Sequence, residues 1–302
     1  MADFQTSTIQ QIEQLIGAGQ FDAALPLGKK LVEQAPNIAA GWYWLGQVQL
    51  LRGELPMASS CFQQAVRLET NNALYWTNAA IALLGLGKLP EAEKCARQAA
   101  QLDPNSETVW INLGSTLFQQ NQWVGAASAY QRAVSLAPEN AIAWKNLATA
   151  EMRLDHLEAA QAAFERGLTI SPDPDSALNY ALLLLRLNKP QHAAHILQQI
   201  VDQVPDLPLA WHAWGDVQTM LNQPVEAEKA YRRVLENEPQ NHAAQLGLAL
   251  SLLTQFRVSE AAVVARELVQ ALPKRRSLGD AGRNRTSGCQ YSRGPEGLSE
   301  SR

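Results

Sequence analysis

The sequence has few cysteines and no long apolar run, and both absences exclude whole classes of protein. Only three of its 302 residues are cysteines, which argues against a disulfide-stabilised scaffold and for a reducing compartment. Apolar runs such as Ala181–Leu185 are far too short to cross a bilayer. The N-terminus has no basic region followed by an apolar stretch, so no secretory signal is expected. We therefore expect a cytoplasmic protein that does not enter a membrane.

The sequence also lacks an excess of charge of one sign. Its formal net charge is −4, and 46% of its residues are hydrophobic. The chain is thus neither basic, as nucleic-acid binders are, nor depleted of apolar residues, as disordered chains are. We expect no nucleic-acid partner.

What the sequence does have is an internal repeat. Blocks of thirty-four residues, with one interval of thirty-three, begin at Gln5, Ala39, Ala73, Glu107, Ala141, Asp175, Pro208 and His242. The twentieth position is alanine in all eight blocks, and the fourth is tryptophan in five. The eighth position is small in six blocks, the twenty-fourth is aromatic in four, and proline closes seven.

These columns predict two helices in each block. Positions four, seven, eight and eleven share one face of a first helix, and positions twenty, twenty-four and twenty-seven share one face of a second. The small residues allow the two helices to approach closely, and the terminal proline ends the second helix. Because a pair of short helices cannot bury its apolar face alone, we expect neighbouring pairs to stack into a solenoid.

The pattern W-x-x-L-G…A-x-x-x-[FY]-x-x-A…P, which covers residues 5–273, resembles the tetratricopeptide repeat family. The resemblance implies an all-α fold, a right-handed α-solenoid of about eight helix-turn-helix units whose first helices line a concave groove. The block at 175–207 departs from the pattern, because Leu178 replaces the tryptophan and Gln198 replaces the aromatic. We expect there either a local change of superhelical pitch or a merely degenerate repeat.

Three asparagines, Asn78, Asn112 and Asn146, occupy the sixth position of consecutive blocks and are expected to point into the groove. Neighbouring helices pack about 8–10 Å apart and an extended peptide advances about 3.3 Å per residue, so one asparagine would meet a bound chain about every third residue. Each amide offers a donor and an acceptor to a peptide backbone. The arrangement resembles the asparagine ladder of protein O-linked N-acetylglucosamine transferases. The alternative is that these are ordinary solvated groove residues.

The groove columns of later blocks carry a mildly basic set of side chains. This set could attract an acidic peptide or a terminal carboxylate, and a solvated face with scattered charge is the alternative. Asp216 is the main opposing charge. The remaining candidate binding residues are Lys145, Arg153, Asn179, Arg186 and His212.

No pattern in residues 5–273 indicates an active site. The sequence has no phosphate loop, nucleophile elbow or cluster of zinc ligands. His192 and His195 lie three residues apart on a second helix, and without a third ligand we interpret them as a surface pair rather than a metal site. Cys61 and Cys95 are expected to be packing residues. We therefore predict no catalysis, no cofactor and no metal.

Residues 274–302 form a different kind of sequence, with five glycines, five serines and seven basic residues. We predict a low-complexity tail, either a disordered extension or an out-of-frame reading in place of a downstream domain. The predicted last helix, Ser259–Leu272, has no capping element after it, which makes self-association a further expectation. The function we expect is a scaffold that binds an extended peptide or a partner helix. The alternative is the substrate-selecting N-terminal region of a modular transferase, a sulfotransferase or a glycosyltransferase.

Overall fold

The computed structural model describes residues 2–271, with side chains from 4 to 269, and all regular structure in this range is helical. Between residues 2 and 271, sixteen α-helices form eight consecutive pairs, which confirms the predicted all-α solenoid. The predicted tail at 274–302 lies outside the described residues, as does Leu272. The helices are α1 (Ala2–Gly17), α2 (Phe21–Gln34), α3 (Ala39–Leu51), α4 (Leu55–Leu68), α5 (Ala73–Gly85), α6 (Leu89–Leu102), α7 (Glu107–Gln119), α8 (Trp123–Leu136), α9 (Ala141–Arg153), α10 (Leu157–Ile170), α11 (Pro174–Arg186), α12 (Pro190–Gln203), α13 (Pro208–Met220), α14 (Pro224–Asn237), α15 (His242–Thr254) and α16 (Val258–Ala271).

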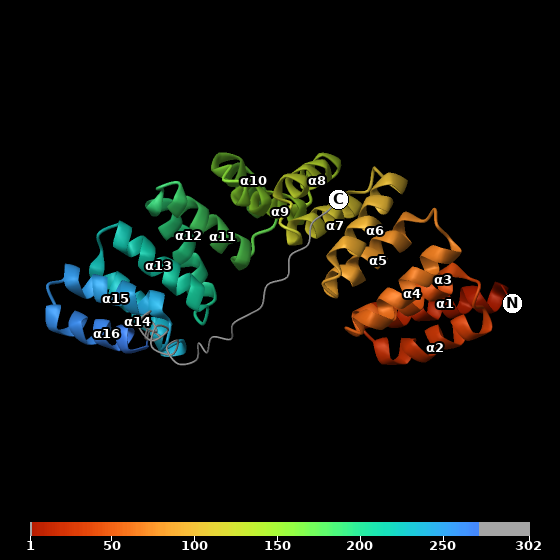
Figure 1. Cartoon of the computed structure of the whole chain (residues 1–302), viewed down its shortest axis with the longest axis horizontal. Helices are drawn as coiled ribbons and strands as arrows, with labels where there is room; N and C mark the ends of the chain where they lie inside the picture. Colours follow the sequence, from red (N-terminus) through yellow and green to blue (C-terminus); the bar gives the residue numbers. More distant parts are fainter. Residues whose placement is uncertain (1, 272–302) are drawn as a thin grey trace, which may run out of the picture.

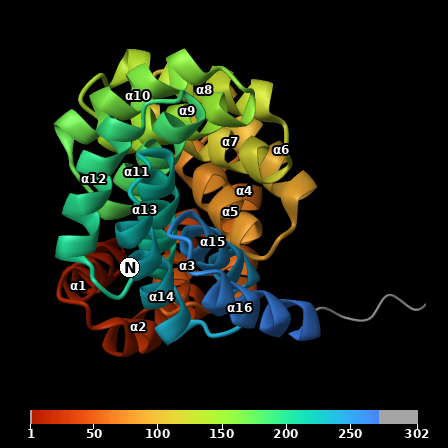
Figure 2. The same cartoon turned by 90° about the vertical axis from the view of Figure 1, so that its left-hand side faces the viewer.

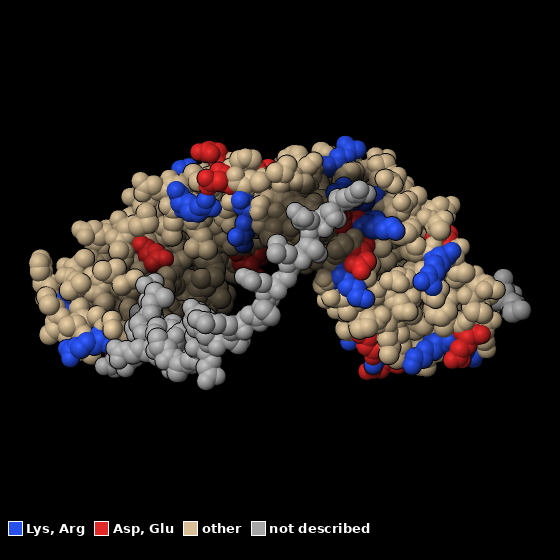
Figure 3. Space-filling model, in the orientation of Figure 1, with Lys and Arg blue, Asp and Glu red and all other residues tan. Residues whose placement is uncertain are grey.

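The helix pairs stack into a curved, right-handed array that forms an arch (Figure 1). Seen from one end of the arch, α7, α9, α11 and α13 lie toward the inside, while α6, α8, α10 and α12 lie on the outside (Figure 2). The space-filling view shows the surface hollowed beneath the arch (Figure 3). The first helix of each pair therefore faces the hollow, as expected for a solenoid with a concave groove.

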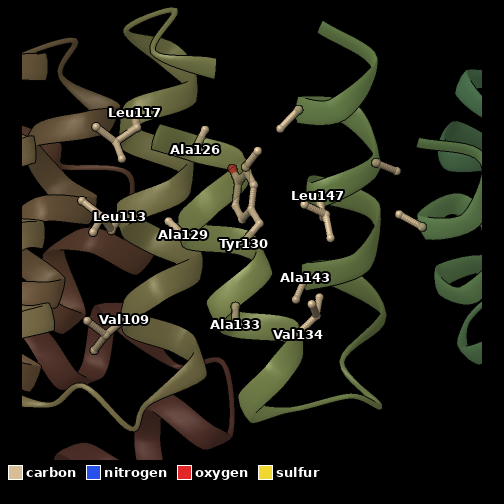
Figure 4. Packing of buried hydrophobic residues seen from close by; sticks show 14 of the residues in the cluster. Val109, Leu113, Leu117, Ala126, Ala129, Tyr130, Ala133, Val134, Ala143 and Leu147 are labelled. Atoms are coloured by element: carbon tan, nitrogen blue, oxygen red, sulfur yellow. The ribbon is translucent and has the colours of Figure 1, made fainter. Parts of the chain in front are cut away.

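In the second, fourth and seventh pairs the core is built around a close approach between an aromatic ring of the second helix and a glycine of the first. Tyr130 on α8 is 3% exposed, and a Cβ atom added to Gly114 on α7 would lie 2.5 Å from its ring. Figure 4 shows this ring between α7 and α9, above the small side chains of Ala129 and Ala133. The eighth-position glycine thus makes room for the twenty-fourth-position aromatic, which explains why the two columns occur together.

Consecutive pairs are tied together by the first-helix tryptophans. In five pairs the indole N–H donates to the backbone carbonyl oxygen six residues earlier, at 2.7–2.9 Å. In the last pair, Gln245 takes this place and donates its Nε2 to the Pro239 carbonyl at 3.0 Å. This bond fixes the turn that enters each first helix, so the tryptophan column stabilises the junction between blocks as well as the core.

The turn within each pair uses one left-handed residue. It occupies the fifteenth position of seven blocks and the fourteenth of the block at 175–207, and it has a positive φ between 55° and 77°. Glycine and asparagine adopt this conformation most readily, whereas a phenylalanine in it is strained. The residue is Gly19, Gly53, Gly87, Asn121, Asp155, Asn188, Asn222 or Phe256 in the eight successive pairs.

Candidate functional site

The inner surface of the arch is formed by the side of each first helix that faces away from its partner. In α9, Ala143, Leu147 and Ala150 are buried against the neighbouring helices, whereas Ile142 is 62% exposed. Neighbouring first helices flank α9 on both sides (Figure 2). The side of each first helix that remains exposed is therefore directed into the hollow, and we call this surface the groove.

Asn78, on α5, is used within the array. Its side chain is buried, with 7% of the residue exposed. The amide oxygen accepts a hydrogen bond from Gln47 Nε2 at 2.8 Å, and the amide nitrogen donates to the Leu74 carbonyl at 2.8 Å. Asn78 thus links α3 to α5, and a bound peptide would have to displace these bonds to reach it.

Asn112 on α7 and Asn146 on α9 differ from Asn78 in exposure and in hydrogen bonding. Both are half-buried at equivalent positions of consecutive first helices. Neither side-chain amide makes a hydrogen bond to any described residue. Asn179 on α11 is likewise half-buried without a side-chain partner in the described range. Each of these amides keeps its donors and its acceptor available.

Lys145 holds the junction between the fifth and sixth pairs. Its ammonium donates to the Ser171 carbonyl at 2.5 Å and to the Asp173 carboxylate, and only 14% of its side chain is exposed. Burial acts to raise the pKa of Asp173, but hydrogen bonds from Lys145 and the Ser176 amide outweigh it and lower that pKa. In this conformation Lys145 is therefore engaged in the framework.

His212 and Arg186 also have acidic neighbours. His212 Nδ1 lies 3.3 Å from the Asp216 carboxylate, which raises the pKa of the imidazole. Arg186 donates to the Asp155 carboxylate. Both side chains that the sequence predicts in the groove are thus engaged by carboxylates, and Asp155 neutralises the charge of Arg186.

Arg153 stands apart from these pairs, because its guanidinium lies 5.8 Å from the centre of the Trp123 ring. Basic and acidic groups are intermingled on the face in view in Figure 3. The groove cations are thus divided among local partners and do not form a field of one sign.

The described residues offer little for catalysis. Burial raises the pKa of both Cys61 and Cys95 to about 11, so both thiols are protonated at neutral pH and are poor nucleophiles. His192 and His195 line a pocket of about 300 Å³ between α10 and α12. No group of three His, Cys, Asp or Glu side chains within residues 4–269 is arranged to hold a metal ion.

The C-terminal end of the described array exposes aliphatic side chains. Val263 and Val269 on α16 are 48% and 68% exposed. A shallow pocket of about 400 Å³ lies beside them, lined by Ala262, Ala265, Arg266 and Val269. No helix in the described part of the chain is both long and apolar enough to cross a membrane.

Comparisons with known proteins agree with this architecture. Models of the tetratricopeptide repeat match residues 15–84, as well as 77–141, 111–177, 145–208 and 220–275. No curated protein sequence matches the chain.

Several solved structures share the fold at low sequence identity. The Cut9–Hcn1 hetero-tetramer of the APC/C has a TM-score of 0.64 at 17% identity, over 80% of this chain and 48% of that one. PilF of Pseudomonas aeruginosa has a TM-score of 0.61 at 18% identity, over 68% of this chain and 95% of that one. YrrB, described as a TPR protein with an unusual peptide-binding site, has a TM-score of 0.55 at 17% identity, over 62% and 96%. The present chain thus spans about half of the Cut9–Hcn1 chain that it matches.

Proposed function

Because this chain belongs to the tetratricopeptide repeat family, whose arrays generally serve as protein–protein interaction scaffolds, we propose that its groove binds an extended segment of a partner protein. Proteins of this family are typically non-enzymatic, and we propose the same for residues 5–273. A cytoplasmic location stays a prediction.

The unoccupied amides of Asn112 and Asn146 carry the proposal. They lie on consecutive first helices, and such helices pack about 8–10 Å apart, which is close to three residues of an extended peptide. A half-buried amide without a partner gains most from a ligand that supplies both a carbonyl and an N–H, as a peptide backbone does. In this proposal Asn78 supports the groove, and Asn112 and Asn146 bind the peptide. Lys145, Arg153, Asn179, Arg186 and His212 form its surroundings.

The proposal is tested by selecting twelve-residue peptides from a random displayed library on the full chain and measuring their affinities by fluorescence anisotropy. We expect the Asn112→Ala/Asn146→Ala double variant to bind a selected peptide at least about tenfold more weakly, because each lost hydrogen bond contributes about 1 kcal/mol. Its melting temperature should stay unchanged. Asn78→Ala should instead lower the melting temperature, because it removes the hydrogen bond from Gln47 that links α3 to α5 and leaves Gln47 with Tyr43 alone.

A second measurement tests whether the peptide is held by its backbone. N-methylation of single peptide bonds removes one donor at a time. In this proposal, a methylation that weakens binding to the wild type has no further effect on the double variant. Equal affinity of the wild type and the double variant for every selected peptide would refute the proposal.

Two further expectations remain predictions. A substrate-selecting arm of a modular transferase would use the same groove, and the described residues hold no feature specific to that alternative.

Self-association would use the exposed aliphatic face of α16, whose Val269 is 68% exposed. Sedimentation of the wild type and of Val269→Asp over a range of concentrations measures this self-association. We expect the substitution to shift any dimer toward monomer.

A further inference from the structure

Along the groove, the second residue of the first helices alternates between large aliphatic side chains and small or polar ones. Three large aliphatic residues occupy it in the third, fifth and seventh pairs: Leu74, Ile142 and Leu209, with exposures of 50%, 62% and 55%. The second residue of the first helix in the pairs between and beside them is small or polar: Ala40, Thr108, Asp175 and Ala243. Single exposed aliphatic residues are common on protein surfaces. Their general frequency does not explain why they alternate regularly over seven helix pairs.

The spacing of these three side chains, together with the free amides between them, defines the ligand that would match. We propose that the groove selects an extended peptide segment with apolar side chains six residues apart, which contact Leu74, Ile142 and Leu209 in turn. This inference rests on the proposed function, because the same peptide backbone would be held by Asn112 and Asn146.

The six-residue interval follows from two lengths. Helices two pairs apart are separated by about 16–20 Å, which is five to six residues of an extended chain. Side chains of an extended chain alternate between two sides, so the residues that face the groove are an even number apart. Six is the even interval within this range, and three contacts then require a segment of thirteen residues.

The charges of the groove fit an apolar and backbone-bound ligand better than an acidic one. Lys145 is bound to Asp173, Arg186 to Asp155, and His212 lies beside Asp216. A ligand held mainly by charge would have to compete with these carboxylates. Binding of the apolar peptide should therefore depend little on salt concentration.

The test uses synthetic peptides of one composition and two arrangements, with both ends blocked. The first has leucine at positions 1, 7 and 13 and serine, threonine or glutamine elsewhere, and the second has its leucines at positions 1, 5 and 9. We expect the full chain to bind the first peptide at least about tenfold more tightly than the second. Raising the salt from 50 to 500 mM should change the first affinity by less than about twofold.

Two protein variants assign the selectivity to the groove. Ile142→Ser should weaken binding of the first peptide about tenfold, because it removes one apolar contact from the middle of the segment. Val124→Ser is the matched control, since Val124 is 71% exposed but lies on α8, on the outer side. It should leave binding unchanged. Equal loss in both variants would overturn the inference.

The outcomes separate this inference from the proposed function. If library-selected peptides bind in a manner that depends on Asn112 and Asn146, but the two synthetic peptides bind equally or not at all, the groove function stands and the six-residue selectivity is wrong. The chain could instead bind the first peptide more tightly than the second, with an affinity that Asn112→Ala/Asn146→Ala does not change. The proposed binding of the peptide backbone by these two asparagines would then be wrong, and with it the basis of this inference.

Discussion

The junction before α9 and the junction before α11 do the same structural work with different chemistry. Before α9, the Trp144 indole donates to the Pro138 carbonyl at 2.8 Å, and Asn140 caps the helix by accepting from the Ala143 amide. Both of these bonds are between neutral groups, and the one ion pair of this turn that the described residues show, Glu139 with Arg166, is largely exposed. Four other pairs use the same tryptophan bond, so this is the ordinary junction of the array.

In α11 the fourth helical position, which holds Trp144 in α9, is occupied by Ala177 and not by Leu178 as the sequence blocks predicted. Ala177 has no side-chain donor to replace the indole N–H. Lys145 reaches across from α9 instead and donates to Ser171 and Asp173. Asp173 also caps α11, because its carboxylate accepts from the Ser176 amide at 2.8 Å. An ionic contact between Lys145 and Asp173 thus takes the place of the neutral tryptophan hydrogen bond. We therefore expect the two junctions to respond differently to mutation, salt and pH.

The largest difference is expected from Lys145→Met. Hydrogen bonds to charged groups contribute about 1.5–3 kcal/mol each, and partial exposure of Asp173 reduces the loss, so we expect the free energy of unfolding to fall by about 2 kcal/mol. Urea unfolding measures the loss, and hydrogen exchange should place it in α11. Lys94→Met, which replaces an exposed lysine on α6, is the control and should change stability little. An unchanged urea midpoint for Lys145→Met would contradict the ionic account of this junction.

Trp144→Phe should have a smaller effect at the ordinary junction. The substitution keeps an aromatic ring but removes one neutral N–H···O bond near the surface, where the Pro138 carbonyl can bind water. We expect a loss of about 1 kcal/mol, measured by the same urea titration. Added salt should reduce the effect of Lys145→Met and leave that of Trp144→Phe unchanged. The same salt response in both variants would mean that the two junctions do not differ in kind.

Acid should narrow the gap between the wild type and Lys145→Met. The pKa of Asp173 is lowered in the folded protein, so its contribution to stability is present above the unfolded pKa of about 3.9 and is lost as the pH falls through the folded value. Other carboxylates titrate in both proteins, so the quantity to follow is the difference between their free energies of unfolding. We expect this difference to be constant from pH 5 to 7 and to shrink below about pH 4. A constant difference down to pH 2 would show that the Asp173 charge has no part in it.

The repeat columns were enough to predict the fold because each column has a local physical cause. Small residues at the eighth position and aromatics at the twenty-fourth are visible in the sequence, and Gly114 and Tyr130 show why they occur together. Two other signals were present but were not used. The fifteenth position is Gly, Asn or Asp in six blocks, which indicates the left-handed turn. In four of the five blocks with a fourth-position tryptophan, a proline lies six residues before it and accepts the indole hydrogen bond.

The candidate site was less predictable, because equivalent positions do not have equivalent partners. Asn78, Asn112 and Asn146 share one column, yet only Asn78 has a Gln47 beside it, contributed from thirty-one residues away. Lys145 was expected in the groove, but its ammonium is held by Ser171 and Asp173 in the irregular turn. Periodicity predicts the face on which a side chain lies. It does not predict which neighbour the side chain will bind when adjacent blocks differ.

The smallest effect is expected from removing the charge of Asp155, which pairs with Arg186 across the same irregular junction. Asp155 and Arg186 have side-chain exposures of 76% and 47%, and exposed pairs of this kind contribute about 0–1 kcal/mol. Asp155→Asn keeps a residue type that the array already places at this left-handed position, in Asn121, Asn188 and Asn222. We expect it to change the free energy of unfolding by less than about 0.5 kcal/mol. Asp155→Ala should cost about 1 kcal/mol more, because alanine is poorly suited to a φ of 63°. If the two variants lose the same stability, the charge rather than the backbone conformation sets the role of Asp155.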